Sequence, residues 1–200
     1  MSHDIRTPMN AVLGFATLLS MDAENPAKVR EYTRKITSSG QHLLSLINDI
    51  LDVSKIESGK VALNLEKFAL SDVVSSVEAI IQPMAKARGQ AFHVEVTGLR
   101  HEYLVGDETR INQILINLLS NAVKYTQEGG CIWFRLIGLQ QRSAQYEHIC
   151  IEVEDNGYGM TPEYLKTIFD AFTRAENSTT NKVQGTGLGM AITKSIVELM

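Results

Sequence analysis

The segment from Arg110 to Thr126 constrains the fold more than any other stretch, because it predicts an amphipathic helix with an unusual polar face. Its apolar side chains recur at helical spacing and are expected to pack on a core. Asn117 and Asn121 lie four residues apart, one turn from each other on one face of that helix. Asparagine is a mediocre helix former, so two of them at this spacing need an explanation.

Two interpretations of this polar face are open. Carboxamide oxygens are neutral, hard ligands of the kind that Mg²⁺ takes together with waters and nucleotide phosphates. Lys124 follows Asn121 by about one turn and would add a positive charge for such phosphates. The alternative is a plain helix whose two asparagines and one lysine are solvated. Glycine-rich motifs further along the chain bear on the choice.

Two long helices are predicted before Gly59. The first runs from Ser2 to about Asp22, with His3 on the polar stripe opposite its apolar seam. Asn25 and Pro26 predict the start of the second, as an Asn cap followed by a proline at the first helical position. The first seam consists of Ile5, Met9, Val12, Ala16 and Leu19. The second consists of Val29, Tyr32, Ile36, Ser39, Leu43, Leu46, Ile50 and Val53.

The apolar stripe of the second helix is too broad for one partner. Leu44, Ile47 and Leu51 widen it beyond the seam. Two helices cannot bury such a stripe between themselves, so we expect the hairpin to form a homodimeric four-helix bundle. The alternative is that the hairpin packs only on the domain that follows.

Strands and helices alternate after a predicted domain boundary at residues 58–60. We therefore expect an α+β protein of two domains, residues 1–59 and 60–200, the second with a sheet covered by helices. Strands are predicted over residues 61–65, 91–96, 103–105, 132–136 and 149–153. Helices are predicted over residues 70–88 with Ser71 as the cap, over 110–126, from Pro162 and from Gly189.

Composition narrows the class of function. Hydrophobic residues make up 44% and charged residues 21%, which is ordinary for a globular protein. The net charge of -4 argues against a nucleic-acid partner. No apolar run is long enough to span a membrane, so a cytoplasmic location is expected, with any membrane anchor outside this segment. Cys131 and Cys150 lack metal-ligand spacing and are expected to be buried free thiols.

Two glycine motifs follow the asparagine helix. In the first, Asp155 would accept a hydrogen bond from the amine of adenine, while Gly157 and Gly159 permit close approach of the backbone. The second opens the last helix, where backbone amides bind phosphate. Each motif alone is equally compatible with an ordinary turn. The second motif consists of Gly185, Thr186, Gly187, Leu188 and Gly189.

A polar stretch lies between the glycine motifs, from Thr173 to Gln184. We expect it to be a lid that orders over a nucleotide, anchored in the core by Phe169 and Phe172. A disordered surface loop is compatible with the same residues.

Taken in order, these motifs resemble those of the sensor histidine kinases of two-component signalling, over essentially the whole chain. The first motif looks most like that of hybrid kinases, which often carry a receiver domain downstream. The resemblance implies a dimeric helical hairpin joined to an α/β sandwich of the Bergerat type that binds ATP. Residues 2–10 resemble the phosphoacceptor box, 117–126 the N box, 155–159 the G1 box, 169–172 the F box and 185–189 the G2 box.

On matching positions, the resemblance makes His3 the phosphorylated residue. Neutral imidazole is a nucleophile near pH 7, and Asp4 would accept the proton from one ring nitrogen. The phosphoryl group would then pass to an Asp of a response-regulator receiver domain. Thr7, one turn from His3, is associated in this family with dephosphorylating that receiver.

Phosphoryl transfer needs mainly positioning and charge neutralisation. The resemblance implies that Asn121, assisted by Asn117, holds Mg²⁺, and that Lys124 and Arg174 add positive charge at the phosphates of ATP. It also places Tyr125 in the nucleotide pocket.

Two other functions stay open. Hydrolytic relatives of the gyrase kind carry a Glu at the position of Asn117 to activate water, which Asn cannot do, so a GHKL-type ATPase is the runner-up enzyme. A catalytically silent dimerisation and docking module is the other alternative. It stays open because the chain stops at Met200, inside the last helix, and we expect the ATP domain to be incomplete there.

Overall fold

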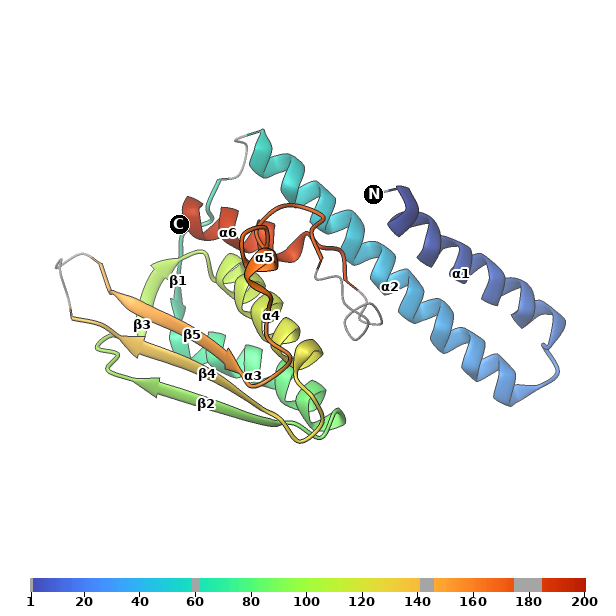
Figure 1. Ribbon diagram of the computed structural model, residues 1–200, viewed down its shortest axis with the longest axis horizontal. Coiled ribbons are helices and arrows are strands. Elements are labelled where there is room, and N and C mark those ends of the chain that lie inside the picture. Colours follow the sequence, from blue (N-terminus) through green and yellow to red (C-terminus); the bar gives the residue numbers. More distant parts are fainter. Residues whose placement is uncertain (1, 59–61, 141–145, 175–184) are drawn as a thin grey trace.

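The computed structural model describes residues 2–58, 62–140, 146–174 and 185–200, and it leaves out the side chains of residues 2–4, 56 and 57. Figure 1 shows a helical hairpin beside an α/β unit. Helix α2 lies between helix α1 and the α/β unit, so one face of α2 meets each neighbour. The expected α+β architecture, a hairpin followed by an α/β domain, is confirmed.

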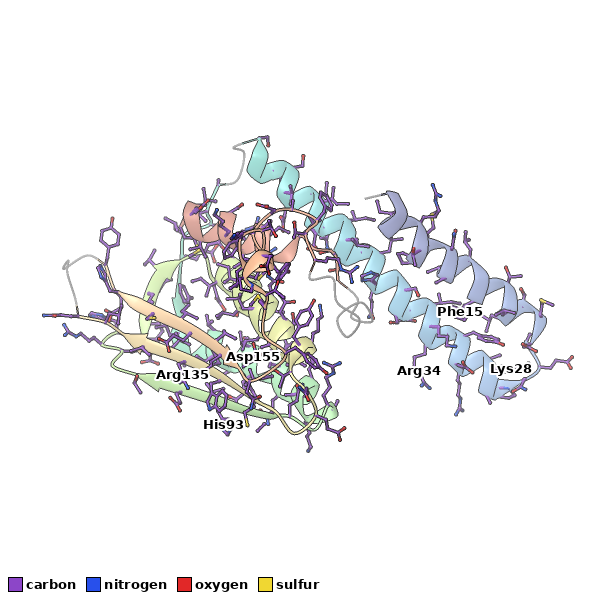
Figure 2. The ribbon with its side chains drawn as sticks, in the orientation of Figure 1. Phe15, Lys28, Arg34, His93, Arg135 and Asp155 are labelled. Atoms are coloured by element: carbon purple, nitrogen blue, oxygen red, sulfur yellow. The ribbon has the colours of Figure 1, made fainter. Side chains whose placement is uncertain are left out.

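The hairpin consists of α1 (Ser2–Met21) and α2 (Pro26–Glu57). The predicted cap of α2 is confirmed, because Asn25 Oδ1 accepts hydrogen bonds from the amides of Ala27 and Lys28 at 3.2 and 3.3 Å. Near the turn, the rings of Phe15 and Tyr32 stack with centroids 6.1 Å apart. Figure 2 shows Phe15 between the two helices and Lys28 at the turn end of the hairpin.

The seam predictions were right for α2 and only partly right for α1. Every predicted seam residue of α2 is at least partly covered, and Leu46 is buried. In α1, Met9 and Ala16 are exposed, because Phe15 packs on α2 instead and turns the contact face. The three residues that widen the apolar stripe of α2 are exposed to solvent in this single chain. Leu44, Ile47 and Leu51 are 64%, 42% and 51% exposed.

The described residues of the α/β unit form two small sheets. β1 (Glu66–Ala69) pairs antiparallel with β3 (Tyr103–Gly106). In the larger sheet, β4 (Cys131–Gly138) lies between β2 (Ala91–Thr97), which is parallel to it, and β5 (Ile149–Asp155), which is antiparallel. The helices α3 (Leu70–Ala87) and α4 (Glu108–Tyr125) cover one face of this larger sheet. Their apolar residues and the inner face of β4 form the main core.

Two helices complete the unit, α5 (Pro162–Leu165) and α6 (Gly189–Leu199). The predicted start of α5 is confirmed, because Thr161 Oγ1 accepts a hydrogen bond from the Tyr164 amide at 3.2 Å. A second cluster joins Ile114 of α4 to Leu188, Ile192 and Ile196, with Ile50 of α2 against it. Within the described ranges, no helix is both long and apolar enough to cross a membrane.

Several local predictions were wrong. Residues 62–65 form no strand, because the Asn64 amide donates to Asp107 Oδ2 at 2.9 Å and ties this linker to α4 instead of to a sheet; Val61 lies outside the described residues. Ser71 does not cap α3, whose N-cap is Ala69 without a side-chain bond. Cys131 and Cys150 are free, as expected, but only half-buried.

The two phenylalanines do not anchor in the core. Phe169 and Phe172 are 45% and 46% exposed. Phe172 instead takes a positive φ of 65° and its amide donates to the carbonyl of Gly187 at 2.9 Å. The remainder of the predicted lid, residues 175–184, lies outside the described residues.

Candidate functional site

Helix α4 has one face in the core and one face on a cavity of about 440 Å³. The buried face carries Leu115, Leu119 and Val123. Asp107 caps the helix, since its Oδ1 accepts from the Arg110 amide at 3.0 Å. A cavity of this size is in the range of small-molecule sites. The predicted nucleotide residues that line it are Asn117, Asn121, Lys124, Tyr125, Arg174, Gly185, Thr186, Gly187 and Gly189.

The asparagines bind helix α6 through their amide nitrogens. Asn117 Nδ2 donates to Thr193 Oγ1 at 2.8 Å, and Asn121 Nδ2 points to Met190 Sδ at 3.7 Å. These contacts use the amide nitrogens, and a carboxamide has its oxygen as a separate acceptor. Gly189 permits this contact, because a Cβ built on it would lie 2.2 Å from Asn117 Oδ1.

The residues before α6 form a tight turn at the edge of the cavity. Thr186 Oγ1 accepts a hydrogen bond from the Leu188 amide at 3.1 Å. Gly187 has a φ of +71°, and a Cβ there would lie 2.9 Å from the backbone carbon of Phe172. Leu188 was predicted among the nucleotide residues, but its side chain is fully buried and does not line the cavity. It fixes the turn to the second apolar cluster.

The cavity contains cationic side chains in a partly desolvated position. Burial lowers the pKa of Lys124, the nearby Asp49 carboxylate raises it, and the positive charge of Arg174 lowers it further. An ammonium group held in this way gains from an anionic ligand, because a negative charge offsets the loss of water. The site therefore suits a polyanion such as a nucleotide phosphate chain.

The turn at residues 155–159 lies next to the cavity but does not line it. Gly157 approaches the end of α4 so closely that a Cβ would lie 2.2 Å from the carbonyl oxygen of Tyr125. The Tyr158 amide donates to the same oxygen at 3.1 Å. Asp155 is exposed at the end of β5 (Figure 2), where its Oδ1 accepts from the Gly157 amide at 2.9 Å.

The structure therefore brings the first glycine motif against Tyr125, and leaves Asp155, Gly157 and Gly159 outside the cavity lining. Tyr164 and Ile168 line the cavity instead on that side. Their positions follow from the short helix α5, and no sequence pattern indicated them.

A wall of the cavity comes from the hairpin, which the sequence analysis did not anticipate. His42, Ser45 and Asp49 of α2 line it together with Gln113 of α4. Their spacing of three and four residues marks one face of a helix, and that polar stripe was the available signal. Read alone, such a stripe in an amphipathic helix is simply a solvated face.

The phosphoacceptor candidates lie on α1, on the far side of α2 from the α/β unit (Figure 1). The side chains of His3 and Asp4 lie outside what the structure describes, and Thr7 is exposed. Among the described residues, no three or more His, Cys, Asp or Glu side chains are placed to hold a metal ion. A metal ion at this site would rely on carboxamides and on the ligand's own phosphates.

Two family models match the chain. Residues 1–59 match the His Kinase A (phospho-acceptor) domain, and residues 106–200 match the histidine kinase-, DNA gyrase B- and HSP90-like ATPase.

Relatives of known name span both matched regions. The autoinducer 2 sensor kinase/phosphatase LuxQ of Vibrio vulnificus is 39% identical over 206 residues, which cover all of this chain and 23% of LuxQ. The structure of full-length ShkA in complex with AMPPNP is 30% identical with a TM-score of 0.72, covering all of this chain and 40% of ShkA. The structure of ThkA with the response regulator protein TrrA shares the fold, with a TM-score of 0.62 at 23% identity over 86% of this chain and 48% of that one.

The curated relatives are thus several times longer than this chain, which matches less than a quarter of LuxQ. The two matched domains account for the hairpin and for most of the α/β unit, in the order in which they occur here. The chain belongs to the sensor histidine kinases of two-component signalling, and it carries their phospho-acceptor domain and their ATPase-like domain.

Proposed function

We propose that this chain catalyses the ATP-dependent phosphorylation of its own His3 and that the phosphoryl group then passes to an Asp of a response-regulator receiver domain. The observation that carries this is the cavity. Residues from three separate stretches, Asn117 to Tyr125, Arg174 and Gly185 to Gly189, line one space that contains two cationic groups. The matched ATPase-like domain implies ATP as the ligand.

In this proposal, Lys124 and Arg174 neutralise the phosphate chain, and the backbone at Gly185 and Gly187 approaches it closely. Asn121 and Asn117 would hold a magnesium ion through their carboxamide oxygens, and such an ion would supply further charge neutralisation. Tyr125 lines the cavity and would contact the nucleotide there. Asp155, Gly157 and Gly159 would contribute to the adenine end from outside the present lining.

The chemical step is a displacement at the γ-phosphorus of ATP. A ring nitrogen of His3 forms the new P–N bond, the bond to the β,γ-bridging oxygen breaks, and ADP leaves. Asp4 accepts the proton from the other ring nitrogen and so keeps the attacking nitrogen nucleophilic. Hydrolysis is disfavoured, because Asn117 has no basic group for activating water and its amide nitrogen is bound to Thr193.

Two partners follow from the same proposal. The exposed apolar residues Leu13, Leu44 and Leu51 favour a second copy of the hairpin, in line with the matched domain. The ThkA complex makes a response-regulator receiver the expected acceptor, and the name of LuxQ suggests a phosphatase activity in which Thr7 would take part. Residues 1–59 would form the dimerisation domain and residues 60–200 the ATP-binding domain, both in the cytoplasm.

The test is a labelling experiment with magnesium and γ-labelled ATP on the chain and on His3→Gln. We expect acid-labile, base-stable phosphate on the parent protein and none on the variant. Asn121→Ala serves as a second variant, which should lose labelling because nucleotide binding fails while His3 is intact. Label that persists in His3→Gln would exclude His3 as the acceptor, and rapid release of free phosphate without labelled protein would favour an ATPase.

A further inference from the structure

Helix α2 supplies an acidic side chain to the cavity, and nothing in the proposed phosphoryl transfer uses it. Asp49 shares one face of α2 with His42 and Ser45, and all three line the cavity opposite α4. The ATP site of this chain is therefore composite, with one wall from the ATPase-like domain and another from the phospho-acceptor domain.

Asp49 meets the groups that are proposed to bind phosphate. The Asp49 carboxylate lines the same cavity as Thr186 and Lys124, and it interacts electrostatically with the Lys124 ammonium group. A carboxylate has the same sign of charge as a phosphate and binds the same kinds of donor. Asp49 thus places a negative charge in the cavity that Thr186 and Lys124 also line, as a phosphate would.

Opposing electrostatic influences act on the Asp49 carboxyl group. The pKa of this carboxyl group is raised, mainly by burial and also by Asp52. The Thr186 hydroxyl, Lys124 and His42 act in the opposite direction. Phosphates brought into the same cavity would add negative charge beside a carboxylate that is already partly desolvated. The repulsion falls if either the phosphates or Asp49 leave the cavity.

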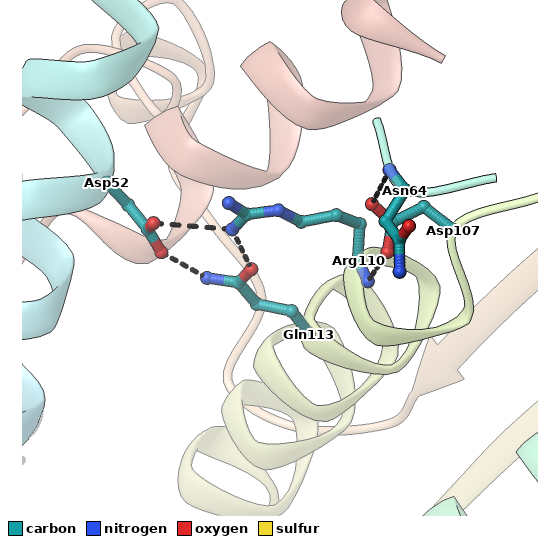
Figure 3. A network of polar contacts seen from close by, with 5 residues as sticks. All are labelled: Asp52, Asn64, Asp107, Arg110 and Gln113. Carbon is teal, nitrogen blue, oxygen red and sulfur yellow. Dashed lines mark hydrogen bonds and ion pairs between the residues drawn. The ribbon is translucent and has the colours of Figure 1, made fainter. Parts of the chain in front are cut away.

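Asp49 would leave together with α2, which among the described residues is held to the α/β unit by a polar network and a small apolar contact. Figure 3 shows the main polar contact, in which Asp52 Oδ2 accepts from Gln113 Nε2 at 2.8 Å and Asp52 Oδ1 accepts from Arg110 Nη1 at 3.3 Å. Arg110 Nη1 also donates to Gln113 Oε1 at 2.7 Å. Ile50 and Val53 add a small apolar contact to the cluster around Ile192.

The same polar network reaches the linker between the two domains. Asp107 binds the amide of Asn64 through one oxygen and the amide of Arg110 through the other, at 2.9 and 3.0 Å (Figure 3). The Asp52 and Arg110 side chains are 18% and 21% exposed, so water competes with their ion pair. Partly exposed pairs of this kind hold a domain contact that opens without unfolding either domain.

Resting on the proposed binding of ATP in this cavity, we propose that Asp49 competes with the nucleotide phosphates for Thr186 and Lys124. Docked α2 then lowers the affinity for ATP, and bound ATP loosens α2 by the same factor. Asp49 is in this sense a residue that sets nucleotide affinity, supplied by the domain that carries the phosphoacceptor. Adenosine has no phosphate, so its affinity should not depend on Asp49.

The test measures binding of AMPPNP with magnesium, and separately of adenosine, by calorimetry on the parent chain, Asp49→Asn and Glu31→Gln. Glu31 is the matched control, because it also lies on α2 and forms an ion pair with Lys35 at 2.7 Å, away from the cavity. We expect Asp49→Asn to tighten AMPPNP binding about fivefold or more and to leave adenosine unchanged. Glu31→Gln should change neither.

Asp52→Asn provides an independent measurement, because Asp52 holds α2 without lining the cavity. It should also tighten AMPPNP binding, and the double variant should gain less than the sum of the two. Weaker binding in Asp49→Asn would overturn the competition and make Asp49 a metal-binding group. Unchanged binding would overturn it outright. A parent that binds neither ligand would remove the proposed nucleotide site, whereas a parent that binds both leaves only the role of Asp49 in question.

Discussion

The two walls of the cavity are built in different ways. The α4 wall is part of the main core, in which Leu115, Leu119 and Val123 are almost completely excluded from solvent. The α2 wall is held by Asp52, by a few half-covered apolar residues and by the linker at Asn64. A core of this kind separates only when the domain unfolds, but a partly exposed polar contact separates at a small free-energy cost.

This difference assigns separate tasks to the two walls. The α4 wall keeps the side chains of Asn117 and Asn121 in place through their contacts with α6, as the proposed binding site would require. The α2 wall, in the proposal above, would change the site by docking or separating, as regulation requires. The proposed phosphorylation would need such freedom, because α1 lies beyond α2 and the phosphoacceptor candidate on it would have to meet the nucleotide (Figure 1).

The largest expected effect comes from the fixed wall. Leu119→Ala removes a fully buried side chain and leaves a cavity, so we expect the free energy of unfolding to fall by about 2–5 kcal/mol. Ile50→Ala on the α2 wall is the matched truncation and should cost about 1 kcal/mol, because that side chain is only partly covered. Urea unfolding followed by circular dichroism measures both. Equal losses would mean that α2 is as integral to the fold as α4.

The next effect concerns the approach of α6 to α4. Gly189→Ala places a Cβ 2.2 Å from Asn117 Oδ1, so Asn117 must turn away and lose its hydrogen bond to Thr193. We expect a loss of stability of about 1–3 kcal/mol. Gly185→Ala is the control from the same motif, since a Cβ there meets nothing within 4 Å. Thermal unfolding of the two variants that gave the same midpoint would contradict the close contact.

A smaller effect is expected at the α2 wall itself. Asp52→Asn leaves Arg110 and Gln113 without their carboxylate, and we expect the docked state to lose about 1 kcal/mol. Hydrogen exchange measured by mass spectrometry should speed up in peptides covering residues 46–53. Asp72→Asn on the exposed side of α3 removes a carboxylate elsewhere and should leave that exchange unchanged. Exchange that stays slow in Asp52→Asn would show that the apolar contact alone holds α2.

The contrast between the walls also marks what the sequence was able to predict. The Asn117 helix, strands β2 to β5 and the start of α2 follow from periodicity and capping, which are local properties, whereas β1 was not predicted. The motif order identified the family, because five short patterns at the right positions rarely occur together by chance. Residues whose positions depend on the core of one domain were therefore predicted well.

Residues whose environment depends on contacts between distant segments were predicted poorly. Asp49 looks like a solvated residue until α2 is placed against the cavity that α4 lines. Residues 62–65 look like a strand until Asp107 binds the Asn64 amide. Phe172 looks like a core residue until its backbone bonds to Gly187. In each case a tertiary contact overrides a local preference, and no spacing along the chain encodes that contact.

The smallest expected effect concerns the hairpin turn, where α2 meets α1. It should not depend on whether the cavity holds a nucleotide. Lys28 Nζ binds Asp22 Oδ1 at 2.9 Å, and Tyr32 donates to Asp22 Oδ2 at 3.1 Å. The Lys28 hydrogen bond is the main cause of a lowered pKa of Asp22, with a further lowering from Tyr32. The ionised carboxylate therefore supports the hairpin turn above pH 3.8, and this support disappears as the pH falls through the lowered pKa.

Lys28→Met should accordingly raise the pKa of Asp22 toward 3.8, as measured by NMR titration of the carboxyl carbon. Lys35→Met is the matched control on the same helix, because Lys35 lowers the pKa of Glu31 and does not touch Asp22. Adding AMPPNP should leave the Asp22 titration unchanged, since the turn lies at the end of the hairpin away from the cavity (Figure 2). An Asp22 pKa that moved with the nucleotide would mean that both faces of α2 respond together, and the separation between a permanent hairpin and a detachable wall would fail.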